Sequence, residues 1–403
     1  MLKGKIEDSN ITRTETEMFE EFLKQPGARK AHRGVILDTP DGSLHLLGFA
    51  KNDDNLPQEA HFYLPFCTSK EALRVLEIKS ADDYLLKKQA DAIADQPREL
   101  RKILAAKDEW QKRGRIWSLT SYYNTLNKDG RSYISALPKR TRRTFSNLAY
   151  GRAPLPQPNG ICLKSLVGDV VMVSDSLHYF FYFTALANLG RFYGLSREQR
   201  AHAFLISLRI MAGVESLDFE LDPRENLPAS VRSEVLSDVG WMMQFTFGHE
   251  FSHYRLGHLD VAAAECEDEI SFAHNLEFDA DAGAICGAGV NAFRAGKLAW
   301  AAQQVFLSFY TLQLAGEHRS DFPNFSVSKT HPSPIERLFA VQNLGLKNQP
   351  VSQDILDDAI GGTERFSTEV LKWIAADNGV FDRYGSVYIP GFGVGRKMDR
   401  IDF

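Results

Sequence analysis

The chain has 403 residues, of which 44% are hydrophobic and 25% are charged. This balance is typical of globular proteins with a buried core, and it excludes collagen-like, low-complexity and wholly disordered chains. The formal net charge of -5 gives no general attraction to nucleic acids or to anionic membranes, so any basic surface must be local. We therefore expect neither nucleic acid nor a membrane as a partner.

The cysteines and the first residues of the chain bear on its compartment. Four cysteines lie far apart and form no C-x-x-C pair, which argues against a disulfide framework and favours the reducing cytoplasm. The first residues are polar and acidic, whereas a signal peptide needs a short apolar core. Residues 298–316 are uncharged and long enough to cross a bilayer, but their glutamines, serine and threonine favour a buried core helix. We expect a cytoplasmic protein.

Residues 33–66 are predicted to form a small antiparallel β unit. Two strand-like runs flank the turn at residues 39–42, which contains proline, aspartate and glycine. We expect the strands of this unit at residues 34–38, 43–49 and 61–66.

A helical connector is predicted to follow the β unit. Residues 69–127 are rich in charge, show helical spacing and are interrupted at Pro97, which predicts two or three helices. Residues 151–160 then contain three prolines and two glycines. Because these residues favour linkers, we place a domain boundary there, at residue 155.

The second half of the chain is predicted to be mainly helical. Residues 168–174 have the β-branched run of a buried strand, and Asp175 is the expected cap of an aromatic helix over residues 176–193. Ser230 is the expected N-cap of a long helix that ends near His258. Further helices are expected at residues 196–211, 268–287, 291–316, 333–346 and 352–377. The fold class is therefore α+β, mainly α in the second half.

The long predicted helix contains an H-E-x-x-H motif that begins at His249 and ends at His253. Two imidazoles four residues apart project from one helix face, so both can bind one zinc ion at about 2.0 to 2.1 Å. Glu250 lies beside them and is placed to act on the attacking water instead of binding the metal.

The surrounding sequence favours a metal site over a chance match. The motif alone is only moderately specific. Four apolar or small residues precede the histidine pair at helical spacing: Val235, Val239, Met242 and Thr246. The pair therefore continues a stripe that we expect to be buried. Two hydrogen-bonded core histidines are the alternative interpretation.

A third ligand is required, and two residues are candidates. His258 lies five residues after His253, about 140° further round the helix, and we discount it. Glu277 lies in a predicted helix where it shares a face with Asp281. A glutamate ligand would give His2Glu coordination with an open fourth position, as in catalytic zinc sites, and Asp281 would orient a ligand imidazole through its other ring nitrogen. An acidic, solvated helix face is the alternative.

These motifs resemble those of gluzincin-type zinc metallopeptidases. The H-E-x-x-H motif, the E-x-x-x-D of Glu277 and Asp281, and a T-H-P-x-x-x-x-R element over residues 330–337 form the three-part pattern of HtpX-type and CAAX-processing peptidases. In order and spacing, the likeness is closest to Lit-type phage-exclusion peptidases. It covers about residues 165–345 and does not extend to the first 150 residues or the last 55.

The resemblance implies a zincin-like metallopeptidase domain and a role for each motif residue. His249, His253 and Glu277 would bind one Zn2+ per chain, Glu250 would serve as general base and acid, and Asp281 would orient a ligand.

Two further residues of the pattern, His331 and Arg337, have two interpretations. Both could turn toward the metal and stabilise the developing oxyanion as catalytic residues. Alternatively, Arg337 pairs with Asp281, and His331 is a residue at the start of a helix capped near residues 330–332.

These expectations divide the chain into three segments. Residues 1–155 would hold the N-terminal β unit and helices with a regulatory or substrate-recognition role, residues 156–348 the metallopeptidase domain, and residues 349–403 a helix and a glycine-rich tail. The expected function is hydrolysis of a peptide bond in a protein substrate, in phage defence or a stress response, under the control of an activating or inhibiting protein partner. The alternatives are a non-catalytic zinc-containing sensor and a membrane-associated processing peptidase.

Three other features of the sequence bear on substrates and ligands. A peptide substrate usually pairs with a sheet edge, and we take residues 170–174 as that strand. The basic cluster at residues 139–143 is interpreted as a solvated helix start rather than an RNA-binding site. Glycines at residues 391–396 follow no βαβ unit and are interpreted as part of a tail rather than a phosphate-binding loop.

Overall fold

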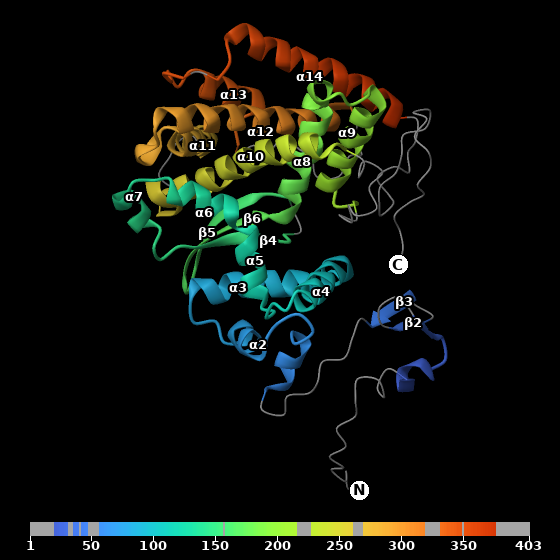
Figure 1. Cartoon of the computed structure of the whole chain (residues 1–403). Helices are drawn as coiled ribbons and strands as arrows, with labels where there is room; N and C mark the ends of the chain where they lie inside the picture. Colours follow the sequence, from blue (N-terminus) through green and yellow to red (C-terminus); the bar gives the residue numbers. More distant parts are fainter. Residues whose placement is uncertain are drawn as a thin grey trace, which may run out of the picture. The chain divides into compact units, whose positions relative to one another are not determined.

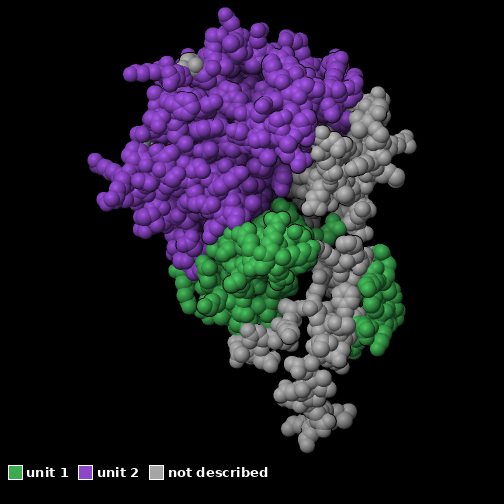
Figure 2. All heavy atoms as spheres, viewed as in Figure 1, with its two compact units in different colours: residues 1–79, 86–122 green, residues 80–85, 123–403 purple. Residues whose placement is uncertain are grey.

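The computed structural model describes most of the chain. The described residues are 20–30, 35–39, 42–46, 56–155, 158–215, 227–260, 269–318, 331–348 and 350–375. They divide into two compact units, coloured separately in Figure 2. Unit 1 comprises residues 1–79 and 86–122, and unit 2 comprises residues 80–85 and 123–403. The glycine-rich tail at residues 391–396 lies outside the described residues.

Unit 1 contains a three-stranded antiparallel sheet in the order β1-β2-β3. Strands β2 (Val35–Thr39) and β3 (Gly42–Leu46) form the predicted hairpin, with Thr39 opposite Gly42 at its closed end. The third strand is β1 (Ala28–Lys30), which precedes the hairpin and pairs with β2. The prediction of a third strand at residues 61–66 was wrong, because this segment forms the 3-10 helix η1 (Gln58–Phe62) and the turns after it.

The helical connector begins in unit 1 and holds four helices instead of two or three. They are α2 (Ser69–Leu76), α3 (Ala81–Ala94), α4 (Pro97–Lys112) and α5 (Leu119–Leu126). Pro97 starts α4, since a proline lacks only an N–H that the first helical turn leaves unpaired. The buried carboxylate of Glu71 completes a capping box with Thr68 and accepts hydrogen bonds from the backbone N–H groups of Leu119 and Thr120. Glu71 thus fixes two helix starts at once.

Unit 2 contains a mixed three-stranded sheet in the order β4-β6-β5. Strand β6 (Gly168–Ser174) matches the predicted buried strand, and it pairs in parallel with β4 (Ala149–Ala153) and antiparallel with β5 (Gly160–Ser165). The predicted boundary at residue 155 falls between β4 and β5. The chain on both sides of it pairs with β6, so residue 155 lies within unit 2 and does not separate two units. With a partner on each side, β6 has no edge for a substrate, so the prediction for residues 170–174 was wrong.

Helices make up most of the remaining described part of unit 2, as the α+β prediction required. Figure 1 shows α10 between the sheet and α12, with α14 on the far side of α12, and contacts between these elements agree. The helices are α6 (Lys128–Ser135), α7 (Lys139–Thr144), α8 (Asp175–Leu189), α9 (Arg197–Met211), α10 (Ala229–Leu256), α11 (Glu269–Ile285), α12 (Ala292–His318), α13 (Pro334–Gln342) and α14 (Gln353–Ile374). The basic residues of α7 lie outside the core, as expected for a solvated helix start.

Two predicted helix caps differ from those observed. Ser174 and not Asp175 caps α8, because the Ser174 side chain accepts the N–H of Ser176 while Asp175 already lies in the first turn. Pro228 and not Ser230 precedes α10.

Helix α12 contains the uncharged stretch at residues 298–316, and most of that stretch is buried in the core of unit 2. Among the helices that the structure describes, none combines the length and hydropathy needed for a membrane crossing.

Candidate metal centre

Helix α10 presents the two histidines of the H-E-x-x-H motif from its buried side. The four preceding stripe positions, Val235, Val239, Met242 and Thr246, are all buried, as the helical spacing predicted. His249 is 8% exposed, and His253, one turn later, is partly buried. The interior stripe of α10 thus carries both imidazoles toward α11.

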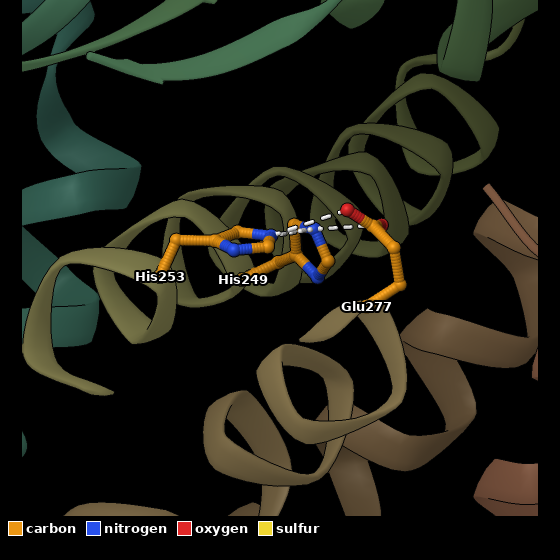
Figure 3. Close-up of side chains that lie close together, drawn as sticks. All are labelled: His249, His253 and Glu277. Carbon is orange, nitrogen blue, oxygen red and sulfur yellow. Dashed lines mark hydrogen bonds and ion pairs between the residues drawn. The ribbon is translucent and has the colours of Figure 1, made fainter. Parts of the chain in front are cut away.

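Helix α11 supplies Glu277, whose carboxylate faces both imidazoles (Figure 3). The His249 Nε2 atom lies 3.0 Å from His253 Nε2 and 3.4 Å from Glu277 Oε2. The His253 Nε2 atom lies 3.4 Å from Glu277 Oε1. Three donor atoms from two helices therefore surround one point.

The spacing of these donors fits a metal ion. Ligands at about 2.0 to 2.1 Å from a tetrahedral zinc ion are separated from one another by about 3.3 Å. One ligand atom from each of His249, His253 and Glu277 lies within 4.8 Å of the others. The buried Oε2 atom of Glu277 lies 3.2 Å from Arg337 Nη1 but accepts no well-aligned hydrogen bond from the described residues, so it has room to bind a metal ion. The triad is therefore compatible with a bound metal.

Asp281 holds the far side of the His249 ring. Its Oδ1 atom lies 2.9 Å from His249 Nδ1, one turn of α11 beyond Glu277. This contact directs the Nε2 atom of His249 toward the other donors, because the two ring nitrogens lie on opposite sides of the imidazole. Asp281 thus occupies the position that the sequence pattern predicted for it.

Arg337 reaches the same cluster from α13. Its Nε atom donates to Asp281 Oδ2 at 2.8 Å, its Nη2 atom donates to Asp281 Oδ1 at 2.7 Å, and its Nη1 atom lies 3.2 Å from Glu277 Oε2. The guanidinium also lies over the Phe306 ring, 4.6 Å from its centroid. Of the two interpretations of Arg337, this arrangement contains the pair with Asp281, and it leaves the guanidinium occupied by carboxylates.

His331 lies at the exposed side of the cluster. Its Nε2 atom is 3.6 Å from Glu277 Oε1, and 48% of its side chain is exposed. The N-cap of α13 is Ser333, in a capping box with Glu336, so the cap predicted near residues 330–332 is displaced by one residue or more. Thr330 lies outside the described residues. Among the described residues of the pattern, His331 thus has the most access to solvent.

Glu250 is buried next to His249 on α10, but it is not one of the three residues whose ligand atoms lie together. Burial raises the pKa of its carboxyl, and the negative charge of Glu277 adds to this rise against the opposing effect of the histidines. The first residue of β5, Gly160, lies so close that a Cβ atom there would be 2.5 Å from Glu250 Oε1. Strand β5 therefore runs directly past this carboxylate.

The pKa values of the triad show how strongly its charges interact. Burial alone would lower the pKa of His249, but hydrogen bonds to Asp281 and Glu277 outweigh burial and raise that pKa to about 9. Burial alone would raise the pKa of Glu277, yet His249 and His253 hold it far below its usual range. The negative charges of the cluster thus favour a proton on His249 and are compatible with a metal ion in its place.

His258 makes a contact in the site that the sequence did not predict. Its Nδ1 atom lies 2.9 Å from the Nδ1 atom of His253. Continued helical geometry would place His258 away from His253, but α10 ends at Leu256 and is capped by Gly257, which has a positive φ of 75°. The signal in the sequence was this glycine, which permits the chain to turn back before His258.

Comparisons with known proteins give no match: no family model, no curated protein and no solved structure matches the chain. The assignment of a function therefore rests on the geometry of the site and on the resemblance of its motifs.

Proposed function

We propose that the chain is a zinc-dependent endopeptidase that hydrolyses a peptide bond in a protein substrate. The observation that carries this proposal is the set of three donor atoms from His249, His253 and Glu277, with the Glu250 carboxylate on the same helix beside them. Two histidines and a glutamate leave a fourth coordination position open, which favours a catalytic over a structural zinc ion. The resemblance of the motifs to gluzincin-type peptidases supports the same assignment.

The residues divide the chemical work among them. When bound, zinc supplies Lewis acidity to the reaction. Glu250 accepts a proton from the attacking water and returns it to the leaving amine, a role suited to a carboxyl whose pKa is raised by burial. His331 lies at the exposed side of the cluster, where it can donate to the developing oxyanion. Arg337 and Asp281 hold the ligands in place.

An extended substrate has a suitable place at β5. In the sheet that the described residues form, β5 is an edge strand, and an edge can add a peptide strand through backbone hydrogen bonds. Because Gly160 lies against Glu250, a peptide paired along β5 would pass next to the base. We therefore place the substrate on β5 in place of β6. The likeness to Lit-type peptidases leads us to propose further a role in phage defence or stress, controlled by a protein partner.

Metal content and substrate capture test this proposal. We expect about one zinc ion per chain in the purified wild type and in Glu250→Gln, and its loss in His253→Ala, as measured by elemental mass spectrometry. The Glu250→Gln variant, which keeps the metal but lacks the base, should retain an uncleaved substrate that the wild type cleaves. A well-folded wild type that takes up no zinc would show that the histidines are core residues. If the wild type binds zinc but cleaves no protein that Glu250→Gln captures, the non-catalytic sensor is favoured.

A further inference from the structure

The turn after α10 brings a third histidine to the metal centre. Gly257 ends α10 in the left-handed conformation, and His258 begins the 3-10 helix η5 (His258–Asp260). The His258 ring then lies against that of His253, with centroids 4.9 Å apart and an interplanar angle of 75°. The two Nδ1 atoms are 2.9 Å apart, which is the distance of a hydrogen bond.

The contact lies on the side of His253 that faces away from the triad. The Nε2 atom of His253 faces His249 Nε2 at 3.0 Å and Glu277 Oε1 at 3.4 Å. The Nδ1 atom is on the opposite side of the same ring and meets His258. His258 therefore contacts the ligand rather than the point that the three donors surround.

The chemistry of imidazole fixes the direction of this hydrogen bond once a metal is bound. A histidine that binds a metal through Nε2 is neutral and carries its proton on Nδ1, so Nδ1 must donate. His258 can accept that hydrogen bond when its own proton is on Nε2. We propose that His258 is a positioning residue, which accepts the Nδ1–H of His253 and holds that ring in the orientation that binds zinc. This inference rests on the proposed zinc site.

The two ligand histidines are then supported by different chemistry. His249 donates to Asp281, a carboxylate that Arg337 balances. His253 donates to an imidazole, which orients the ring without adding negative charge to a site that already holds Glu277, Asp281 and Glu250. A partner of this kind typically contributes a factor of about 10 to 100 in metal affinity.

Two substitutions separate the hydrogen bond from packing. His258→Phe keeps a ring of similar size and removes the acceptor, whereas His258→Asn removes the ring but can place its amide oxygen near the position of Nδ1. His318→Ala is the matched control, because His318 bonds to its own helix at Leu314, away from the triad. Zinc dissociation constants are measured by competition with a chromophoric chelator, and thermal unfolding of the metal-free proteins checks that each variant folds.

We expect His258→Phe to bind zinc about 10 to 100 times more weakly than the wild type, and His258→Asn and His318→Ala to remain close to it. In nitrogen-15 histidine spectra of the zinc-loaded wild type, the Nδ1–H of His253 should exchange slowly with solvent, and it should exchange faster in His258→Phe. Wild-type affinity in His258→Phe would overturn the inference, as would a loss in His258→Asn that His258→Phe does not share. A wild type that binds no zinc would overturn the proposed site and, with it, this role of His258.

Discussion

Arg337 donates two hydrogen bonds to the carboxylate of Asp281, from Nε at 2.8 Å and from Nη2 at 2.7 Å. Both side chains are nearly removed from solvent, with 12% and 2% exposed. The pair joins α13 to α11 and leaves Asp281 in contact with His249. The orientation of the His249 ring on α10 therefore depends on a residue that is 88 positions further along the chain.

Replacing Arg337 should destabilise the protein as well as its metal site. In Arg337→Ala, the buried carboxylates of Asp281 and Glu277 lose the guanidinium and keep only the imidazoles as partners. Removal of one partner from a buried ion pair typically costs about 3 to 5 kcal/mol. We expect a loss of this size in the free energy of unfolding of the metal-free protein, measured by urea denaturation, together with weaker zinc binding.

A double-mutant cycle controls for the loss of packing against Phe306. Arg337→Ala combined with Asp281→Asn should lose less than the sum of the two single variants, because the charge left unpaired by the first change is removed by the second. Additive losses would show that the two side chains do not stabilise each other. An Arg337→Ala variant with normal stability and zinc affinity but a lower catalytic rate would support the oxyanion role instead.

Gly160 should be intolerant of a side chain, although its backbone is an ordinary strand. A Cβ atom there would lie 2.5 Å from Glu250 Oε1, so Gly160→Ala must displace the carboxylate or the strand. Since misplacement of a catalytic group by about 1 Å can cost on the order of 100-fold in rate, we expect a loss of that order in peptide hydrolysis. Zinc content, measured on the same samples, should be unchanged, because Glu250 is not a ligand.

Gly362 provides the matched control for this substitution. It lies within α14, where a Cβ atom would meet nothing within 4 Å. Gly362→Ala should leave activity unchanged and raise stability by roughly 0.5 to 1 kcal/mol, because glycine is unfavourable inside a helix. Full activity in Gly160→Ala would show that Glu250 does not need its observed position.

Local patterns in the sequence predicted the elements that carry the site. Helix α10 and its buried stripe follow from helical spacing alone, and so does the shared face of Glu277 and Asp281 on α11. The distances from His249 to Glu277 and to Arg337 could not be predicted in this way, because they depend on how three separate helices pack.

The errors arose where pairing or chain reversal decides the structure. Strand β1 is three residues long and is defined by its partner β2, so its own sequence gives little signal. The proline-rich stretch at residues 151–160 was interpreted as a boundary, but its two ends are held in one sheet by β6. His258 is not among the grouped ligand atoms, as predicted, but its contact with His253 was missed because helical geometry was extended past Leu256, the last residue of α10.

The stability of the metal-free protein should fall as the pH rises above neutrality. The pKa of His249 is raised to about 9 from its ordinary value of 6.5, so the folded protein holds this proton more tightly than the unfolded chain does. This contribution to stability is complete below pH 6.5 and is lost as the pH rises to about 9, with a slope of at most about 1.4 kcal/mol per pH unit. Urea denaturation with a chelator present, from pH 6 to pH 9.5, measures it.

His249→Ala, treated with the same chelator, is the control for other groups that titrate in this range. It should show little of the decline, because the proton that causes it is absent. An equal slope in this variant and in the wild type would place the effect elsewhere. The lowered pKa values of Glu277 and Asp281 act at acid pH, where their protonation destabilises the fold, and so lie outside this window.

Zinc should stabilise the folded wild type, and this stabilisation should depend on Glu277. The increase in the free energy of unfolding follows from mass action. A ligand that binds only the folded state, at a free concentration of 1,000 times its dissociation constant, adds about 4.1 kcal/mol to the free energy of unfolding. In Glu277→Gln the side chain keeps its size but loses the charged oxygen ligand, so zinc at the same concentration should add little. Glu250→Gln, on the same helix as the two histidines, should keep the full increment because its carboxylate is not a ligand. Denaturation with zinc and with chelator, on all three proteins, gives these increments. An increment in Glu277→Gln equal to that of the wild type would remove Glu277 from the ligand set and leave its contact with the two histidines as an ion pair alone.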